Sequence, residues 1–154
     1  MTNRSPTSPV NDQPVTNPLR RPPDSRPIVS RTVDLTIRIS TVAGAAVLDV
    51  CGEIDVATIP RLHDALLRAT NADAAAAPDQ VLIVDVDGVW SCDDMGLGVL
   101  LGAAGRCRES GGDLVVVCSD GPLRDRLSRT GFDRAIRVTA RLADVISRAA
   151  HESN

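Results

Sequence analysis

Two adjacent acids, Asp93 and Asp94, directly precede an apolar segment with regularly spaced glycines, residues 95–105. Paired carboxylates can act as acid and base, ligate a metal ion, cap a helix or carry the charge of a switch. A second acidic pair, Asp85 and Asp87, follows the apolar run 81–84. Both pairs are therefore candidate functional residues, and the surrounding sequence indicates which of these roles fits each pair.

The pair Asp85 and Asp87 follows a hydrophobic strand in the order Asp-x-Asp, which is similar to the haloacid-dehalogenase-like phosphatases. That resemblance implies one Asp as nucleophile and the other as acid/base, with a magnesium ion. The chain contains no lysine, and Asp93 and Asp94 come too soon to be that family's distal acidic pair. A response-regulator receiver, which also uses a lysine, is disfavoured in the same way. The plainer interpretation is that Asp85 and Asp87 end a strand and form a turn.

Composition excludes several classes of function. The net charge is −3 and the aromatic residues are one Trp and one Phe, which disfavours binding to nucleic acid or to a membrane surface. No apolar run reaches the roughly 18 residues of a membrane helix, and no apolar run follows a basic start. We therefore expect a cytoplasmic protein whose four cysteines are thiols, without a metal site or cofactor.

The chain is predicted to consist of a disordered tail and one domain. Residues 1–31 hold seven of the ten prolines and should be disordered, whereas residues 32–154 should form the domain. Hydrophobic periodicity predicts strands at 33–40, 45–52, 81–86, 114–118 and 136–138, and helices at 56–70, 93–110, 121–131 and 141–150. This order predicts an α/β fold with a mostly parallel sheet of four to five strands and about four helices.

Three segments together resemble the STAS domain, the module shared by sulphate transporters and bacterial anti-sigma factor antagonists. They are GEID at 52–55, VDVDGVWSCDDMGLGVLLGA at 84–103, and the Leu-Val-Val-Val strand that follows. Family members usually read Asp-Ser-Ser/Thr-Gly-Leu-Gly where this chain reads Asp93-Asp94-Met95-Gly96-Leu97-Gly98. The resemblance is closest to the free-standing antagonists and covers residues 33 to about 150.

The resemblance implies a binding module rather than an enzyme. In the family, the antagonist docks on an anti-sigma factor that is also a serine kinase with a histidine-kinase-like ATPase fold, and docking releases a sigma factor. The kinase then phosphorylates the first Ser after the Asp, which ejects the antagonist. Here Asp94 occupies that acceptor position, so the usual switch is absent. Asp94 either mimics the phosphorylated form or leaves the antagonist insensitive to the kinase.

The resemblance also implies a partner surface formed by the start of the second helix and the end of the second strand. The residues concerned are Gly52, Glu53, Asp55, Asp93, Asp94, Met95, Gly96, Gly98 and Gly102. For Asp55, Asp93 and Asp94, capping of a helix is the alternative. For the line Gly98, Gly102 and Gly105, the alternative is close packing within the domain. A domain of this family that senses a ligand or acts as a scaffold is the rival function.

The remaining predictions concern buried groups and surface charge. Trp90 is expected to fill the core beside the acids. Cys51, Cys92 and Cys118 are interpreted as buried small hydrophobes, with a redox switch as the alternative, and Cys107 as core. Six arginines between 124 and 141 indicate a basic side whose charges pair with the acids among them.

Overall fold

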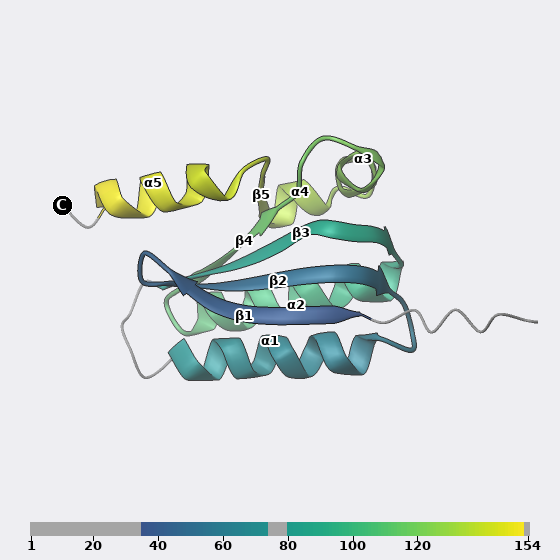
Figure 1. The fold of residues 1–154 in the computed structure, drawn as a ribbon, viewed down its shortest axis with the longest axis horizontal. Helices are drawn as coiled ribbons and strands as arrows, with labels where there is room; N and C mark the ends of the chain where they lie inside the picture. Colours follow the sequence, from purple (N-terminus) through teal and green to yellow (C-terminus); the bar gives the residue numbers. More distant parts are fainter. Residues whose placement is uncertain (1–34, 74–79, 153–154) are drawn as a thin grey trace, which may run out of the picture. The chain divides into compact units, whose positions relative to one another are not determined.

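The fold is a five-stranded sheet with helices on both faces (Figure 1). The computed structural model describes residues 35–73 and 80–152, so the predicted tail at 1–31 lies outside the described residues. The strands are β1 (Thr36–Val42), β2 (Ala45–Ile54), β3 (Val81–Cys92), β4 (Asp113–Val117) and β5 (Arg137–Thr139). The helices are α1 (Ile59–Asp73), α2 (Asp94–Glu109), α3 (Pro122–Arg129), α4 (Phe132–Ala135) and α5 (Leu142–Glu152).

The sheet has the order β1-β2-β3-β4-β5, and only β1 and β2 are antiparallel. A tight turn at Ala43 and Gly44, both with positive φ, joins these two strands. The predicted α/β class and mostly parallel sheet are therefore confirmed. The short helix α4, which follows Gly131 in a left-handed conformation (φ 74°), was not predicted.

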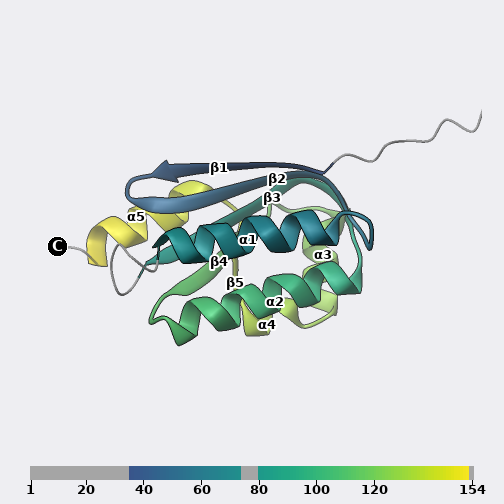
Figure 2. The same ribbon diagram turned by 90° about the horizontal axis from the view of Figure 1, so that it is seen from below.

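One face of the sheet is covered by α1 and α2, which run side by side across it (Figures 1 and 2). Leu62 and Leu66 of α1 and Leu100 of α2 are fully or almost fully buried with Leu48 of β2 and Val84 of β3. The leucines recur at helical spacing and the strand residues at alternate positions, so each element presents one apolar face to this core. The core anchors α2 and thereby its first turn.

The opposite face has a smaller core under α5. Val145 of α5 packs there with Val47, Ile83 and Val115, one residue from each of three neighbouring strands. Because β3 contributes to both cores, it is apolar on both faces along 81–84, as expected for a central parallel strand.

Two strands are longer than predicted, and their length positions the candidate site. β2 continues past Gly52 to Ile54, and β3 continues past residue 86 to Cys92. Gly52 does not end β2 sharply. It lies within the strand with φ 129°, beside a register shift at which Gly52 pairs with Val89 and Glu53 with Ser91, so the extra residue is Trp90 on β3. Since β4 ends opposite Asp85, residues 86–92 of β3 extend beyond β4.

Candidate functional site

The two segments singled out by sequence lie side by side at one end of the sheet. Ile54, the last residue of β2, pairs with Cys92, the last residue of β3. The backbone N–H of Asp93 donates to the carbonyl oxygen of Ile54 at 3.0 Å, which ties the two loops together beyond the strands. The end of β2 and the start of α2 therefore form one continuous surface.

A compact turn holds the first of these loops. The Asp55 carboxylate accepts hydrogen bonds from the backbone N–H groups of Ala57 and Thr58, both at 3.0 Å. The buried Thr58 hydroxyl accepts from the Asp55 N–H at 2.9 Å and donates to the Glu53 carbonyl oxygen at 2.8 Å. The capping interpretation of Asp55 is thus confirmed, because these bonds satisfy backbone groups just before α1. Asp55 remains partly exposed.

Asp93 caps α2. Its side chain accepts a hydrogen bond from the Gly96 N–H at 2.8 Å, and its backbone is extended while the helix starts at Asp94. The carboxylate also lies at the positive end of the helix dipole, which favours its charge. Of the two adjacent acids, Asp93 is therefore the structural one.

Gly96 is buried rather than exposed, and its lack of a side chain is required by packing. A Cβ at this position would lie 2.4 Å from Cγ2 of Ile54 and 2.9 Å from Sγ of Cys92. Gly52 is also buried. Both glycines therefore shape the loops from within, and their predicted contact with a partner stays a prediction.

Asp94 has the opposite environment from Asp93. Its side chain is 86% exposed, and Oδ1 lies 2.6 Å from Nη2 of Arg126 on α3. Arg126 follows Asp94 by 32 residues in the chain, and no local pattern indicates that the two meet. The charge of Asp94 is therefore offset by a neighbouring guanidinium.

Exposed apolar side chains lie on the same elements. Val56, Trp90 and Met95 are 68%, 66% and 58% exposed, and they come from the loop after β2, the end of β3 and the first turn of α2. The prediction that Trp90 fills the core is wrong. Val89 and Cys92 lie in the core, whereas the two residues between them, Trp90 and Ser91, are exposed. Gly52 pairs with Val89 and Glu53 with Ser91, so Trp90 is an extra residue at a register shift, and β4 ends before it reaches Trp90. Large exposed apolar groups that gather in this way are typical of an interaction surface.

Unlike Gly96, the glycines Gly98, Gly102 and Gly105 of α2 do not pack closely against the domain. Gly98 and Gly102 are exposed, and a Cβ at Gly98 or Gly105 would meet nothing within 4 Å. At Gly102 the nearest atom is Nη1 of Arg106 at 3.6 Å, an ordinary contact. The interpretation that this line serves close packing within the domain is therefore wrong. The glycines form an open strip along α2 that begins beside Asp94.

The acids of the phosphatase hypothesis do not lie at a strand end. Asp85 and Asp87 are both inside β3, which continues to Cys92. Asp87 accepts from the Ser119 N–H at 2.6 Å and from its hydroxyl at 2.9 Å, so it holds the loop after β4. Burial raises the pKa of Asp85, and the nearby Asp87 and Asp49 carboxylates add to this rise. Both acids therefore have local structural partners, and neither forms the predicted turn at a strand end.

The cysteines are free thiols in the described part of the chain. Cys92, Cys107 and Cys118 are buried, as predicted, whereas Cys51 is exposed, which corrects its assignment to the interior. Burial raises the pKa of Cys92 to about 11, and burial also raises that of Cys118, so neither forms a thiolate readily. Cys118 directly follows Val117, the last residue of β4, which pairs with Asp85 of β3. Cys92 lies on β3 seven residues beyond Asp85. At about 3.3 Å per residue, the two are on the order of 20 Å apart along the sheet, too far for a disulfide.

Within residues 35–73 and 80–152, no group of three or more His, Cys, Asp or Glu side chains could hold a metal ion. None of the described helices is both long and apolar enough to cross a membrane.

Comparison with known proteins gives a family match. The family model described as the STAS domain matches residues 36–145, which spans every strand and α1 to α4. No curated protein matches this sequence.

Solved structures share the fold. An anti-sigma factor antagonist from Mycobacterium paratuberculosis is 26% identical with a TM-score of 0.63, over 75% of this chain and 93% of that one. An anti-sigma-factor antagonist (STAS) domain protein from Planctomyces limnophilus is 17% identical, with a TM-score of 0.60 over 74% and 97%. The Bacillus cell fate determinant SpoIIAA in its phosphorylated form is 16% identical, with a TM-score of 0.55 over 74% and 99%.

Proposed function

This chain belongs to the STAS domain family, and from that premise we propose that it is an anti-sigma factor antagonist that acts by binding, not by catalysis. It binds an anti-sigma factor in the cytoplasm and thereby releases a sigma factor. The observation that carries this proposal is the exposure of Val56, Trp90 and Met95, each more than half exposed, on the loop after β2, the end of β3 and the first turn of α2, the elements that surround Asp94. The solved anti-sigma factor antagonist with 26% identity supports the choice of partner class.

The proposed partner surface has an apolar part and a polar part. The apolar part is Val56, Trp90 and Met95, with the open glycine strip of α2 next to it. The strip allows a partner backbone to approach α2 closely at Gly98 and Gly102, because no Cβ projects there. The polar part consists of four acids, Glu53, Asp55, Asp93 and Asp94. Asp94 is the most exposed of them, since the other three are only partly exposed.

We propose that Asp94 keeps the protein in its binding state. A phosphoserine carries a charge of about −1.5 to −2, of which one opposing guanidinium cancels only part. Asp94 carries −1, and Arg126 at 2.6 Å offsets it. The local charge therefore resembles that of an unphosphorylated serine more than that of a phosphoserine. A serine kinase has no hydroxyl to modify at this position, so the antagonist is insensitive to it.

The test is the affinity of this protein for the anti-sigma factors of its own genome that have a histidine-kinase-like ATPase fold. Wild type, Asp94→Ser and Arg126→Gln are compared in reducing buffer, with and without ATP. Arg129→Gln on the same helix is the matched control, because it removes the same charge without touching Asp94.

We expect wild type to bind whether or not ATP is present, and Asp94→Ser to bind until ATP is added. Arg126→Gln should weaken binding about two- to fivefold, because an exposed ion pair is worth about 0.2–1 kcal/mol. Binding by Asp94→Ser but not by wild type would show that Asp94 is an off charge and would refute the proposed state. Failure of both to bind any candidate would refute the antagonist function itself.

A further inference from the structure

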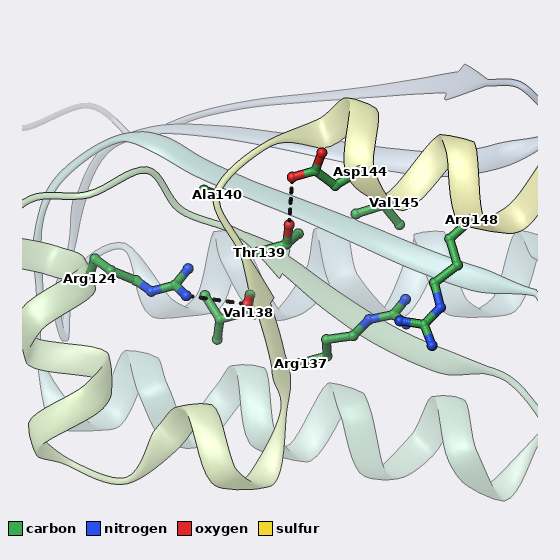
Figure 3. Close-up of a pocket in the computed structure, with 8 residues that line it drawn as sticks. All are labelled: Arg124, Arg137, Val138, Thr139, Ala140, Asp144, Val145 and Arg148. Atoms are coloured by element: carbon green, nitrogen blue, oxygen red, sulfur yellow. Dashed lines mark hydrogen bonds between the residues drawn. The ribbon is translucent and has the colours of Figure 1, made fainter.

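A pocket of about 320 Å³ lies on the other side of the sheet from α1 and α2, between β5, α5 and α3 (Figure 3). Its volume falls within the range of about 300–1,000 Å³ that is typical of small-molecule sites. Three of its lining residues are arginines from three different elements: Arg124 of α3, Arg137 of β5 and Arg148 of α5. We expected the arginines of this region to pair with acids at the surface, and no local sequence pattern indicates a pocket.

The arginines outnumber the acids in this pocket. Among the described residues that line it, Asp144 is the only acid, and it accepts a hydrogen bond from the Thr139 hydroxyl at 3.4 Å. Figure 3 shows the side chains of Arg137 and Arg148 converging from β5 and α5 until their guanidinium groups lie next to each other, while Asp144 points toward Thr139. Two guanidinium groups side by side present several N–H donors to the same part of the pocket.

Arg124 is fixed in place at the edge of the same pocket. Its Nη1 donates to the carbonyl oxygen of Cys118 at 3.1 Å, and its Nη2 donates to that of Val138 at 3.4 Å. Carbonyl oxygens orient the guanidinium but leave its full charge in place, and a guanidinium has further N–H donors. The pocket also lies at the first turn of α5, the positive end of that helix dipole.

We propose that this pocket binds a small molecule through a phosphate group. Guanidinium groups donate paired hydrogen bonds that match the oxygens of a phosphate, which distinguishes arginine from a simple point charge. Val138 and Val145 provide apolar wall beside the arginines, where an uncharged part of the ligand packs. The limited volume fits a small phosphorylated molecule better than an acidic protein segment. The site is separate from Asp94, so it goes beyond the proposed partner surface.

The experiment is titration calorimetry of the whole protein with inorganic phosphate, pyrophosphate, ATP and a short poly-glutamate peptide. The pocket variant is Arg137→Gln/Arg148→Gln. The matched control is Arg129→Gln/Arg134→Gln, which removes the same charge from exposed arginines that do not line the pocket. Circular dichroism melting verifies that both variants fold.

We expect saturable binding of at least one phosphate compound to wild type and to the control, and at least tenfold weaker binding to the pocket variant. Backbone amide shifts in 15N spectra should centre on residues 137–148. Comparison of phosphate, pyrophosphate and ATP distinguishes a free anion from a phosphorylated organic molecule. The proposal is overturned if none of the three binds wild type at millimolar concentration, if pocket and control variants weaken equally, or if only the peptide binds.

Discussion

Alanine substitutions at Gly96 and Gly98 should change stability in opposite directions, although the two residues lie in the same helix. A Cβ at Gly98 meets nothing within 4 Å, so Gly98→Ala gains the helix propensity of Ala, up to about 1 kcal/mol. At Gly96 the same methyl group lies 2.4 Å from Cγ2 of Ile54, inside van der Waals contact. Overpacking of this kind typically costs about 1–3 kcal/mol. We expect Gly96→Ala to be destabilised by about 1–2 kcal/mol after its smaller gain in propensity.

The assay is urea unfolding followed by circular dichroism, because the exposed Trp90 makes fluorescence a poor reporter of the core. A change in midpoint at constant slope reports a change in stability. A double-mutant cycle with Ile54→Ala then tests the cause, since removal of Cγ2 should relieve most of the cost of Gly96→Ala. The reasoning is refuted if Gly96→Ala is as stable as Gly98→Ala, or if Ile54→Ala leaves its cost unchanged.

Four further experiments have clear expectations. Thr58→Val should cost about 1–3 kcal/mol in chemical unfolding, because it removes the hydroxyl that bonds the Asp55 N–H and the Glu53 carbonyl oxygen. Alkylation of the folded protein at pH 8, followed by mass spectrometry, should modify the exposed Cys51 faster than the buried Cys92. The pKa of Cys92 is raised to about 11 in the folded protein, so between pH 9 and 11 the folded state keeps a proton that the unfolded state loses. The free energy of unfolding should therefore fall over this pH range. In Cys92→Ala this part of the pH dependence should be absent. Acrylamide should quench Trp90 readily in the free protein and less in the complex with the anti-sigma factor.

Local patterns in the sequence were sufficient to predict the α/β class and the position of the site. The apolar run at 81–84 and the leucines of α1 and α2 specify buried faces by their spacing alone. The start of α2 was predictable because Asp93 precedes a helical segment and has the side chain of an N-cap. Since parallel strands end at the same edge of a sheet, the loops after β2 and β3 had to lie close together.

Features that depend on which strands and helices pack together were not predictable from local sequence patterns. The exposure of Trp90 follows from the short length of β4, which ends opposite Asp85 and leaves the end of β3 without a neighbour on that side. The pairing of Arg126 with Asp94 depends on where α3 packs, and several other arginines nearby were equal candidates in the sequence. Whether the glycines of α2 face the sheet or the solvent likewise depends on how α2 packs, which the sequence alone does not specify.

The two adjacent acids differ in role, and this difference makes a final prediction. Asp93 caps α2 through the Gly96 N–H, so Asp93→Ala should lower stability by about 1 kcal/mol, whereas Asp93→Ser should retain most of it. Asp94 is 86% exposed, so Asp94→Ala should change stability by less than about 0.5 kcal/mol. In affinity measurements, Asp94→Ser should acquire the response to ATP that wild type lacks, because it restores a hydroxyl without disturbing the cap. A loss of stability in Asp94→Ala equal to that in Asp93→Ala would contradict this division, because it would make both acids structural.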